Sequence, residues 1–152
     1  MFGICFEICG EQGFGWSRRL MLTDALLAED SPPPMRKVGE VLGGRYGYSK
    51  EAAATAPARV VAILRLLSER LAAQKAAGSR YLVGSALSAA DLYWAAFSVL
   101  LDPMPAEACP IPEMLRGWYT NVGPVVAAAI DPALFEHRDR IYRDHLPLPM
   151  DF

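Results

Sequence analysis

At Gly84–Tyr93 the sequence reads G-S-A-L-S-A-A-D-L-Y, and an apolar run follows directly. Ser88 and Asp91 stand three residues apart, which is the spacing of a capping box. In this motif the serine is the N-cap, and the aspartate carboxylate accepts a hydrogen bond from the serine backbone N–H. Leu87 and Leu92 occupy the two positions of a hydrophobic staple. These four residues predict a helix that begins just after Ser88.

Asp91 has two interpretations. The helix dipole stabilises a carboxylate in the first turn, so capping is favoured, and catalysis as a general acid or base is the alternative. Between Leu92 and Leu101 the sequence holds no charge and apolar residues fall on every face, which predicts a helix buried on all sides. This run is much shorter than the roughly 20 residues that cross a bilayer, so we expect no membrane span.

The composition is that of one globular domain. The 152 residues are enough for an ordinary domain, and we assign residues 1–152 to it. Hydrophobic residues make up 53% and charged residues 21%, unlike a disordered chain. The net charge of -2 predicts no nucleic-acid partner and no membrane partner. Three cysteines, an odd number, favour a reducing compartment, and the first residues lack a secretory signal, so we expect a cytoplasmic protein.

The pattern along the chain is helical, and no two strand-like segments are joined by a hairpin turn. We therefore predict an all-α fold, a helical bundle. The predicted helices span residues 1–27, part of 36–55, 57–77, 88–101, 113–119, 125–130 and 132–145. Three glycines weaken the first of these, since each costs roughly 1 kcal/mol in a helix. Prolines at 28–35 predict a break, Pro57 is assigned to the first turn of its helix, and Gly78 to that helix's end.

The segment Gly84–Tyr93 and the order of the helices resemble the C-terminal helical domain of the glutathione transferase family. The resemblance spans the chain, and residues 79–101 carry its distinctive pattern. In that family a thioredoxin-like N-terminal domain supplies the β-sheet, the cis-proline that holds glutathione and the residue that activates the thiol. This sequence has no counterpart of that domain. The resemblance therefore implies a transferase-related domain with no catalytic residue and no cofactor of its own, and glutathione only where a thioredoxin-like domain is supplied.

The resemblance also implies a ligand pocket, because the first and central helices of the family's domain wall the pocket for an apolar electrophile. By this resemblance Cys9, Gly13, Trp16 and Leu100 are the candidates for a small apolar ligand, with an ordinary core role as the alternative. Three functions stay open. The chain is the partner-dependent half of a transferase, a non-catalytic binder of an apolar ligand, or a helical assembly module.

Other clusters have plainer interpretations. Cys5 and Cys9 stand one helical turn apart, but the remaining thiol and imidazole groups are not spaced to complete a metal site. We therefore predict packed thiols and no metal. The run Gly10–Gly15 is interpreted as a place of close helix approach, with room for a ligand or partner as the alternative. His137 and His145 are interpreted as residues that decorate the last helix.

Four aromatic residues of the first predicted helix indicate association. Phe2, Phe6, Phe14 and Trp16 cannot all point into one core at helical spacing. An exposed apolar patch usually marks an interface. We therefore predict a homodimer, or a complex with a separate thioredoxin-like chain, built mainly on residues 1–27.

Overall fold

The computed structural model describes residues 1–150, and all regular secondary structure in this part of the chain is helical. The helices are α1 (Phe2–Cys9), α2 (Phe14–Leu26), α3 (Pro33–Tyr46), α4 (Lys50–Ala76), α5 (Ala89–Phe97), the 3₁₀ turn η1 (Ser98–Leu100), α6 (Glu113–Thr120), α7 (Gly123–Ala127) and α8 (Pro132–His145). The all-α prediction is confirmed. Within residues 1–150, none of the helices combines the length and the apolarity that crossing a membrane requires.

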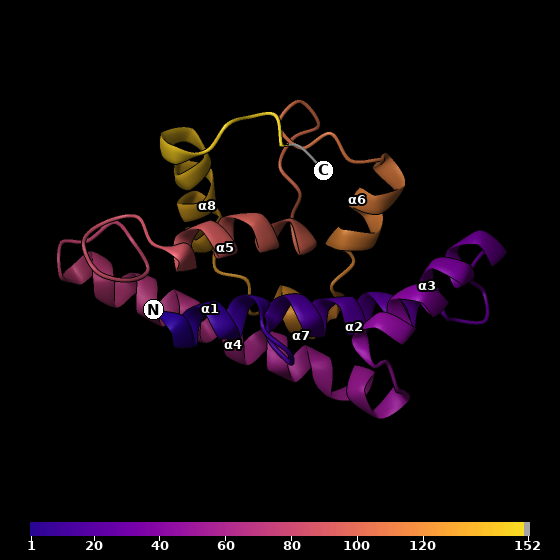
Figure 1. Ribbon diagram of the computed structural model, residues 1–152. Coiled ribbons are helices and arrows are strands. Elements are labelled where there is room, and N and C mark those ends of the chain that lie inside the picture. Colours follow the sequence, from indigo (N-terminus) through magenta and orange to yellow (C-terminus); the bar gives the residue numbers. More distant parts are fainter. Residues whose placement is uncertain (151–152) are drawn as a thin grey trace.

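Helix α5 lies at the centre of the arrangement (Figure 1). Helices α1 and α2 follow one another along the long helix α4, and α3 packs against α2. Helix α5 lies beside α1 on one side and packs against α8 on the other. Its continuation, η1, reaches α6 at the opposite end from α8. Two groups of helices that are far apart in sequence therefore meet on α5.

The core is centred on Trp94 of α5, whose side chain is fully buried. Its ring stands edge-on to that of Phe14 on α2, with the ring centroids 5.4 Å apart. Its indole Nε1 donates a hydrogen bond of 2.8 Å to the backbone oxygen of Leu134 on α8. A buried tryptophan needs such an acceptor for its N–H. This side chain therefore joins three helices in one apolar cluster.

The prediction of one helix over residues 1–27 is wrong, because the chain turns between Cys9 and Phe14. A Cβ atom at Gly13 would lie 2.8 Å from the backbone oxygens of both Phe6 and Glu7, so this turn accepts only glycine there. A Cβ atom at Gly15 would lie 2.3 Å from the Phe97 ring. The glycine-rich run thus allows α2 to approach the end of α5, which confirms the interpretation as close helix approach.

The long helix begins earlier than predicted. Ser49 is the N-cap of α4, and its Oγ accepts a hydrogen bond of 3.1 Å from the backbone N–H of Ala52. Pro57, which was expected in the first turn, lies inside the helix instead. The end was predicted correctly, since Gly78 follows the C-cap with a positive φ of 79°. The prolines near residue 33 also start a helix, α3, within the segment that was predicted as a break.

Candidate functional site

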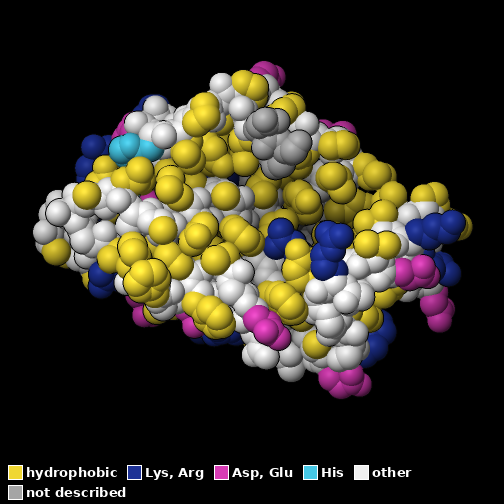
Figure 2. Space-filling model, in the orientation of Figure 1, with side chains coloured by type: hydrophobic (Ala, Val, Ile, Leu, Met, Phe, Trp, Pro, Cys, Tyr) yellow, Lys and Arg dark blue, Asp and Glu magenta, His cyan; other side chains and the backbone are white. Residues whose placement is uncertain are grey.

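One face of the molecule carries an extended apolar surface over α1, α5 and the neighbouring part of α6 (Figure 2). Phe2 and Phe6 of α1 are 82% and 57% exposed, and Tyr93 of α5 is 41% exposed. Ala96, one turn further along α5, is exposed as well. The prediction that α5 is buried on all sides is therefore wrong for this face, since within residues 1–150 no helix covers it.

Two hollows lie on this apolar face. The first, called here the α1/α5 groove, has a volume of about 620 Å³ and is lined by Phe2, Phe6 and Tyr93 among others. The second, the α5/α6 hollow, has a volume of about 450 Å³. Its described lining consists of apolar and aromatic side chains and one charged residue, Arg19; the members are Arg19, Ala96, Phe97, Val99, Leu100, Pro110, Ile111, Pro112, Leu115 and Tyr119. Both hollows suit apolar molecules or apolar protein surface.

Two aromatic rings hold the Arg19 guanidinium at the edge of the α5/α6 hollow. Its Cζ lies 5.2 Å from the centroid of the Tyr46 ring and 5.4 Å from that of Phe97. At such distances a cation is attracted to the ring face. Nη1 also donates a hydrogen bond of 3.0 Å to the backbone oxygen of Gly15. The charge is thus fixed beside an apolar surface.

The neighbouring arginine fixes the walls of the same hollow from inside the protein. Arg18 is 2% exposed, and burial lowers the pKa of its guanidinium to about 10. Its Nε donates a hydrogen bond of 2.9 Å to the backbone oxygen of Leu100, and its Nη2 donates one of 3.0 Å to that of Tyr119. These bonds tie α2 to η1 and α6, which form two walls of the α5/α6 hollow.

The four residues predicted to line one pocket are placed apart. Cys9 is exposed in the α1/α5 groove, and Leu100 lines the α5/α6 hollow. Trp16 lies in a third hollow between α2, α3 and α4, where its ring stands edge-on to that of Tyr46 at 5.1 Å. Gly13 is buried in the turn between α1 and α2. The structure does not bring these residues together, so a ligand contact of any one of them stays a prediction.

The capping box at the start of α5 is present, with Ser88 as the N-cap. The Asp91 side chain is fully buried, and its Oδ2 accepts hydrogen bonds from the backbone N–H of Ser88 at 2.9 Å and from the Ser88 hydroxyl at 2.6 Å. The structural interpretation of the aspartate agrees with this geometry. Leu92 packs against a small cluster around Ala95, whereas Leu87 is exposed, so their staple contact stays a prediction.

The other carboxylate oxygen of Asp91 has partners that the sequence did not indicate. Oδ1 accepts a hydrogen bond of 2.7 Å from the backbone N–H of Leu82 and lies 2.9 Å from Nε2 of His137. Burial by itself would raise the pKa of the Asp91 carboxyl. The hydrogen bonds from His137, Leu82 and Ser88 outweigh it and lower the pKa below the ordinary 3.8.

His137 was predicted to decorate the surface, and that prediction is wrong, because the side chain is 3% exposed. Its Nδ1 lies 2.7 Å from Nη2 of Arg140. A guanidinium can only donate, so Nδ1 accepts and Nε2 carries the proton that is donated to Asp91. One sequence signal was available. His137 stands three residues after Leu134 and four before Ile141, both of which are buried, so it belongs to the inward face of α8.

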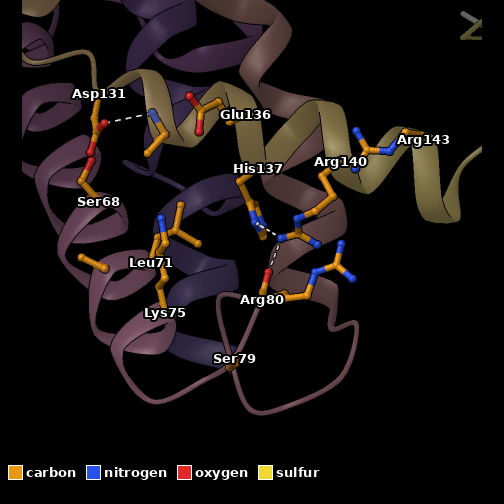
Figure 3. A pocket seen from close by; sticks show the side chains of 12 residues that line it. Ser68, Leu71, Lys75, Ser79, Arg80, Asp131, Glu136, His137, Arg140 and Arg143 are labelled. Carbon is orange, nitrogen blue, oxygen red and sulfur yellow. Dashed lines mark hydrogen bonds between the residues drawn. The ribbon is translucent and has the colours of Figure 1, made fainter.

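Arg140 also lines a cleft of about 470 Å³ that carries both charged and apolar side chains and is called here the α4/α8 cleft (Figure 3). Its walls are α4, the segment around Arg80, and α8. Arg140 Nη2 also donates to the backbone oxygen of Arg80. Arg140 Nη1 and the Ser68 hydroxyl are buried and have no hydrogen-bond partner. The cleft therefore contains buried polar atoms that are left unpaired.

The thiols and the second histidine, His145, do not belong to a comparable cluster of buried polar groups. Cys9 Sγ donates to the backbone oxygen of Cys5 at 3.1 Å, and His145 Nε2 lies 3.2 Å from the Tyr81 hydroxyl. Within residues 1–150, no three side chains of the metal-binding types gather at one place. Comparisons of the chain with protein-family models, with curated proteins and with solved structures found no match.

Proposed function

We propose that this chain is a glutathione-transferase-like C-terminal helical domain, inactive by itself, that binds the apolar part of a small ligand and docks a second protein. The observation that carries the proposal is the apolar face over α1, α5 and α6, which is more extensive than the scattered apolar residues normal for a surface (Figure 2). The resemblance of Gly84–Tyr93 to the family's domain agrees with this function.

The α5/α6 hollow is the ligand-binding part of the proposal. Small-molecule sites are concave, mostly apolar and carry a few polar groups that orient the ligand. Phe97, Leu100 and Leu115 provide apolar surface, and Arg19 provides the polar group. The described lining contains no thiol, serine or imidazole, and in this proposal the thiol of glutathione is the nucleophile. A thioredoxin-like partner would bring glutathione to this hollow, and the chain by itself would conjugate glutathione no faster than buffer does.

The α1/α5 groove is the docking part of the proposal. Phe2 and Phe6 expose more than half of their side chains there. Covering such rings with a second copy of the chain, or with a thioredoxin-like chain, removes apolar surface from water and favours association. All three cysteines are free thiols, which agrees with a cytoplasmic location.

A fluorescence titration with N-phenyl-1-naphthylamine, a neutral apolar dye, tests the ligand site. The wild-type chain is expected to bind it saturably, and Leu115→Gln is expected to weaken binding by about tenfold, because a polar side chain replaces apolar wall. Met114→Gln is the matched control, since Met114 is the adjacent residue of α6, is exposed and does not line the hollow. Absence of saturable binding, or equal effects of the two substitutions, would overturn the ligand site.

A further inference from the structure

The α4/α8 cleft shares no lining residue with the two hollows of the apolar face, so it calls for a separate explanation. Its walls carry four cations and two carboxylates; the cations are Lys75, Arg80, Arg140 and Arg143, and the carboxylates are Asp131 and Glu136. Figure 3 shows these side chains arranged around the opening between α4 and α8. The question is which of these charges have partners within the protein.

Two of the four cations already have a carboxylate partner. Arg80 and Arg143 both pair with Asp144, at 3.1 Å and 3.0 Å. Lys75 and Arg140 have no carboxylate within ion-pair distance among residues 1–150. Of the two lining carboxylates, Asp131 accepts a hydrogen bond of 2.9 Å from the backbone N–H of Ala133 as the N-cap of α8. The other lining carboxylate, Glu136, has no ion-pair partner in the described part of the chain either. The cleft therefore presents two cations without an ion-pair partner, and the carboxylate of Glu136 without one.

The hydrogen bonds of Arg140 show which of its donor atoms has no acceptor. Nη2 donates to His137 Nδ1 and to the backbone oxygen of Arg80, whereas the buried Nη1 has no acceptor. Burial, and then the positive charge of Arg80, lower the pKa of the guanidinium. Buried polar groups are normally paired, and a guanidinium can only donate. A partner of Nη1 therefore has to be an acceptor, and a negatively charged oxygen forms the strongest such bond.

The rest of the cleft has an apolar part. Leu71 and Ala72 of α4 and Ala133 of α8 line it beside the charged groups. The Ser68 hydroxyl, buried and without a partner, offers one more polar contact. A volume of about 470 Å³ admits a molecule larger than a simple inorganic ion.

We propose that the α4/α8 cleft binds a small organic oxyanion, a carboxylate or a phosphate attached to an apolar body. The charged group accepts from Arg140 Nη1 and is attracted by Lys75, and the apolar body lies against Leu71 and Ala133. Binding at Arg140 also supports His137 and, through it, Asp91 at the start of α5. A ligand in the cleft therefore stabilises the folded chain, and above its Kd this stabilisation grows with the logarithm of the ligand concentration.

The test compares three probes that share a benzene ring: phenyl phosphate, benzoate and neutral benzyl alcohol. Melting temperatures are followed as each probe is added to the full chain, with ionic strength held constant by sodium chloride, and affinities are measured by calorimetry. Phenyl phosphate and benzoate are expected to bind saturably in calorimetry and to raise the melting temperature progressively with their concentration. Benzyl alcohol is expected to leave the melting temperature unchanged. The tighter of the two anions identifies the preferred charged group.

The substitution that tests the site is Lys75→Gln, because Lys75 is exposed and its replacement leaves the core intact. It is expected to weaken anion binding about tenfold, as loss of a charged contact does. Arg65→Gln is the matched control, since it removes the same charge from an exposed position of α4 that does not line the cleft. Absence of saturable binding of either anion in calorimetry, equal binding of benzyl alcohol, or equal weakening by both substitutions would overturn the proposal.

Discussion

The two sides of α5 differ in burial and in the hydrogen bonds that their side chains form. Toward α8, Asp91 accepts hydrogen bonds from three residues and Trp94 donates one, and both side chains are fully buried. Toward the apolar face, Tyr93 and Ala96 are exposed on the same helix. An apolar composition by itself therefore does not cause a helix to be buried on every side. Burial depends on which neighbours are present, and the side without neighbours is where we place a partner.

The largest expected effect separates two phenylalanines close together in sequence. Phe14→Asp is expected to unfold the chain at a cost of more than about 5 kcal/mol, because it places an unpaired carboxylate next to Trp94 in the core. Phe6→Asp is expected to leave the free energy of unfolding nearly unchanged and to weaken self-association. This differs from the prediction made from sequence, in which both residues belonged to the interface.

Urea unfolding and sedimentation at several concentrations measure the two outcomes. Val41→Asp on α3 is the control for Phe6→Asp, since Val41 is 63% exposed and lies outside the α1/α5 groove. A wild-type chain that stays monomeric at tens of micromolar would count against the docking surface. A folded Phe14→Asp variant would count against the core described for α2 and α5.

The second effect separates the two members of the capping box. Asp91→Ala is expected to cost about 3–5 kcal/mol, because it leaves His137 and the Leu82 N–H without their buried acceptor. Ser88→Ala is expected to cost about 1 kcal/mol, the usual loss for an N-cap. A capping box without further partners would give similar costs of about 1–2 kcal/mol for both. Urea unfolding curves of the two variants measure these costs. Equal midpoints for Asp91→Ala and Ser88→Ala would contradict the larger cost expected for Asp91→Ala.

A third effect tests the approach of α2 to α5. Gly15→Ala is expected to cost about 1–3 kcal/mol, because the new methyl group overlaps the Phe97 ring. Gly44→Ala on α3 is the control. Its methyl group would meet nothing within 4 Å, so the change is expected to stabilise the helix by roughly 0.5–1 kcal/mol. Thermal unfolding measures both, and a stabilised Gly15→Ala variant would contradict the close contact.

The smallest effect is a dependence on pH. The pKa of Asp91 is lower in the folded chain than the ordinary 3.8, so its contribution to stability is complete above that value and is lost as the pH falls through the folded pKa. The Asp91→Asn variant has no carboxylate at this position, so its stability does not include this dependence on pH. The difference in unfolding free energy between wild type and Asp91→Asn is therefore expected to shrink below about pH 4. Urea titrations over that range measure it, and a constant difference would mean that the carboxylate titrates alike in both states.

What the sequence predicted correctly was local. The capping box needs only Ser88 and Asp91 at the right spacing, and the end of α4 needs only a glycine after the last turn. The start of α4 was missed because Pro57 is a good first-turn residue, and the N-cap at Ser49 carries a weaker signal. The break after α1 was underestimated, because the contacts that require glycine at position 13 come from the folded turn itself.

The candidate sites depended on partners far apart in the chain. His137 lies 46 residues from Asp91, and no periodicity pairs them. The α5/α6 hollow has a wall formed by Pro110, Ile111 and Pro112, which lie outside every helix that the sequence predicted. The α4/α8 cleft was not predicted at all, because its unpaired atoms become visible only once α4 and α8 are in place.

Arg18 has a consequence for how the chain folds. Its two backbone acceptors, on Leu100 and Tyr119, lie 82 and 101 residues further along the chain. Contacts of such long sequence separation slow folding, because the intervening loop has to close first. Until those carbonyls arrive, α2 cannot settle into the core without burying a bare charge, which is costly. The guanidinium thus makes docking of the N-terminal helices conditional on synthesis having passed Tyr119.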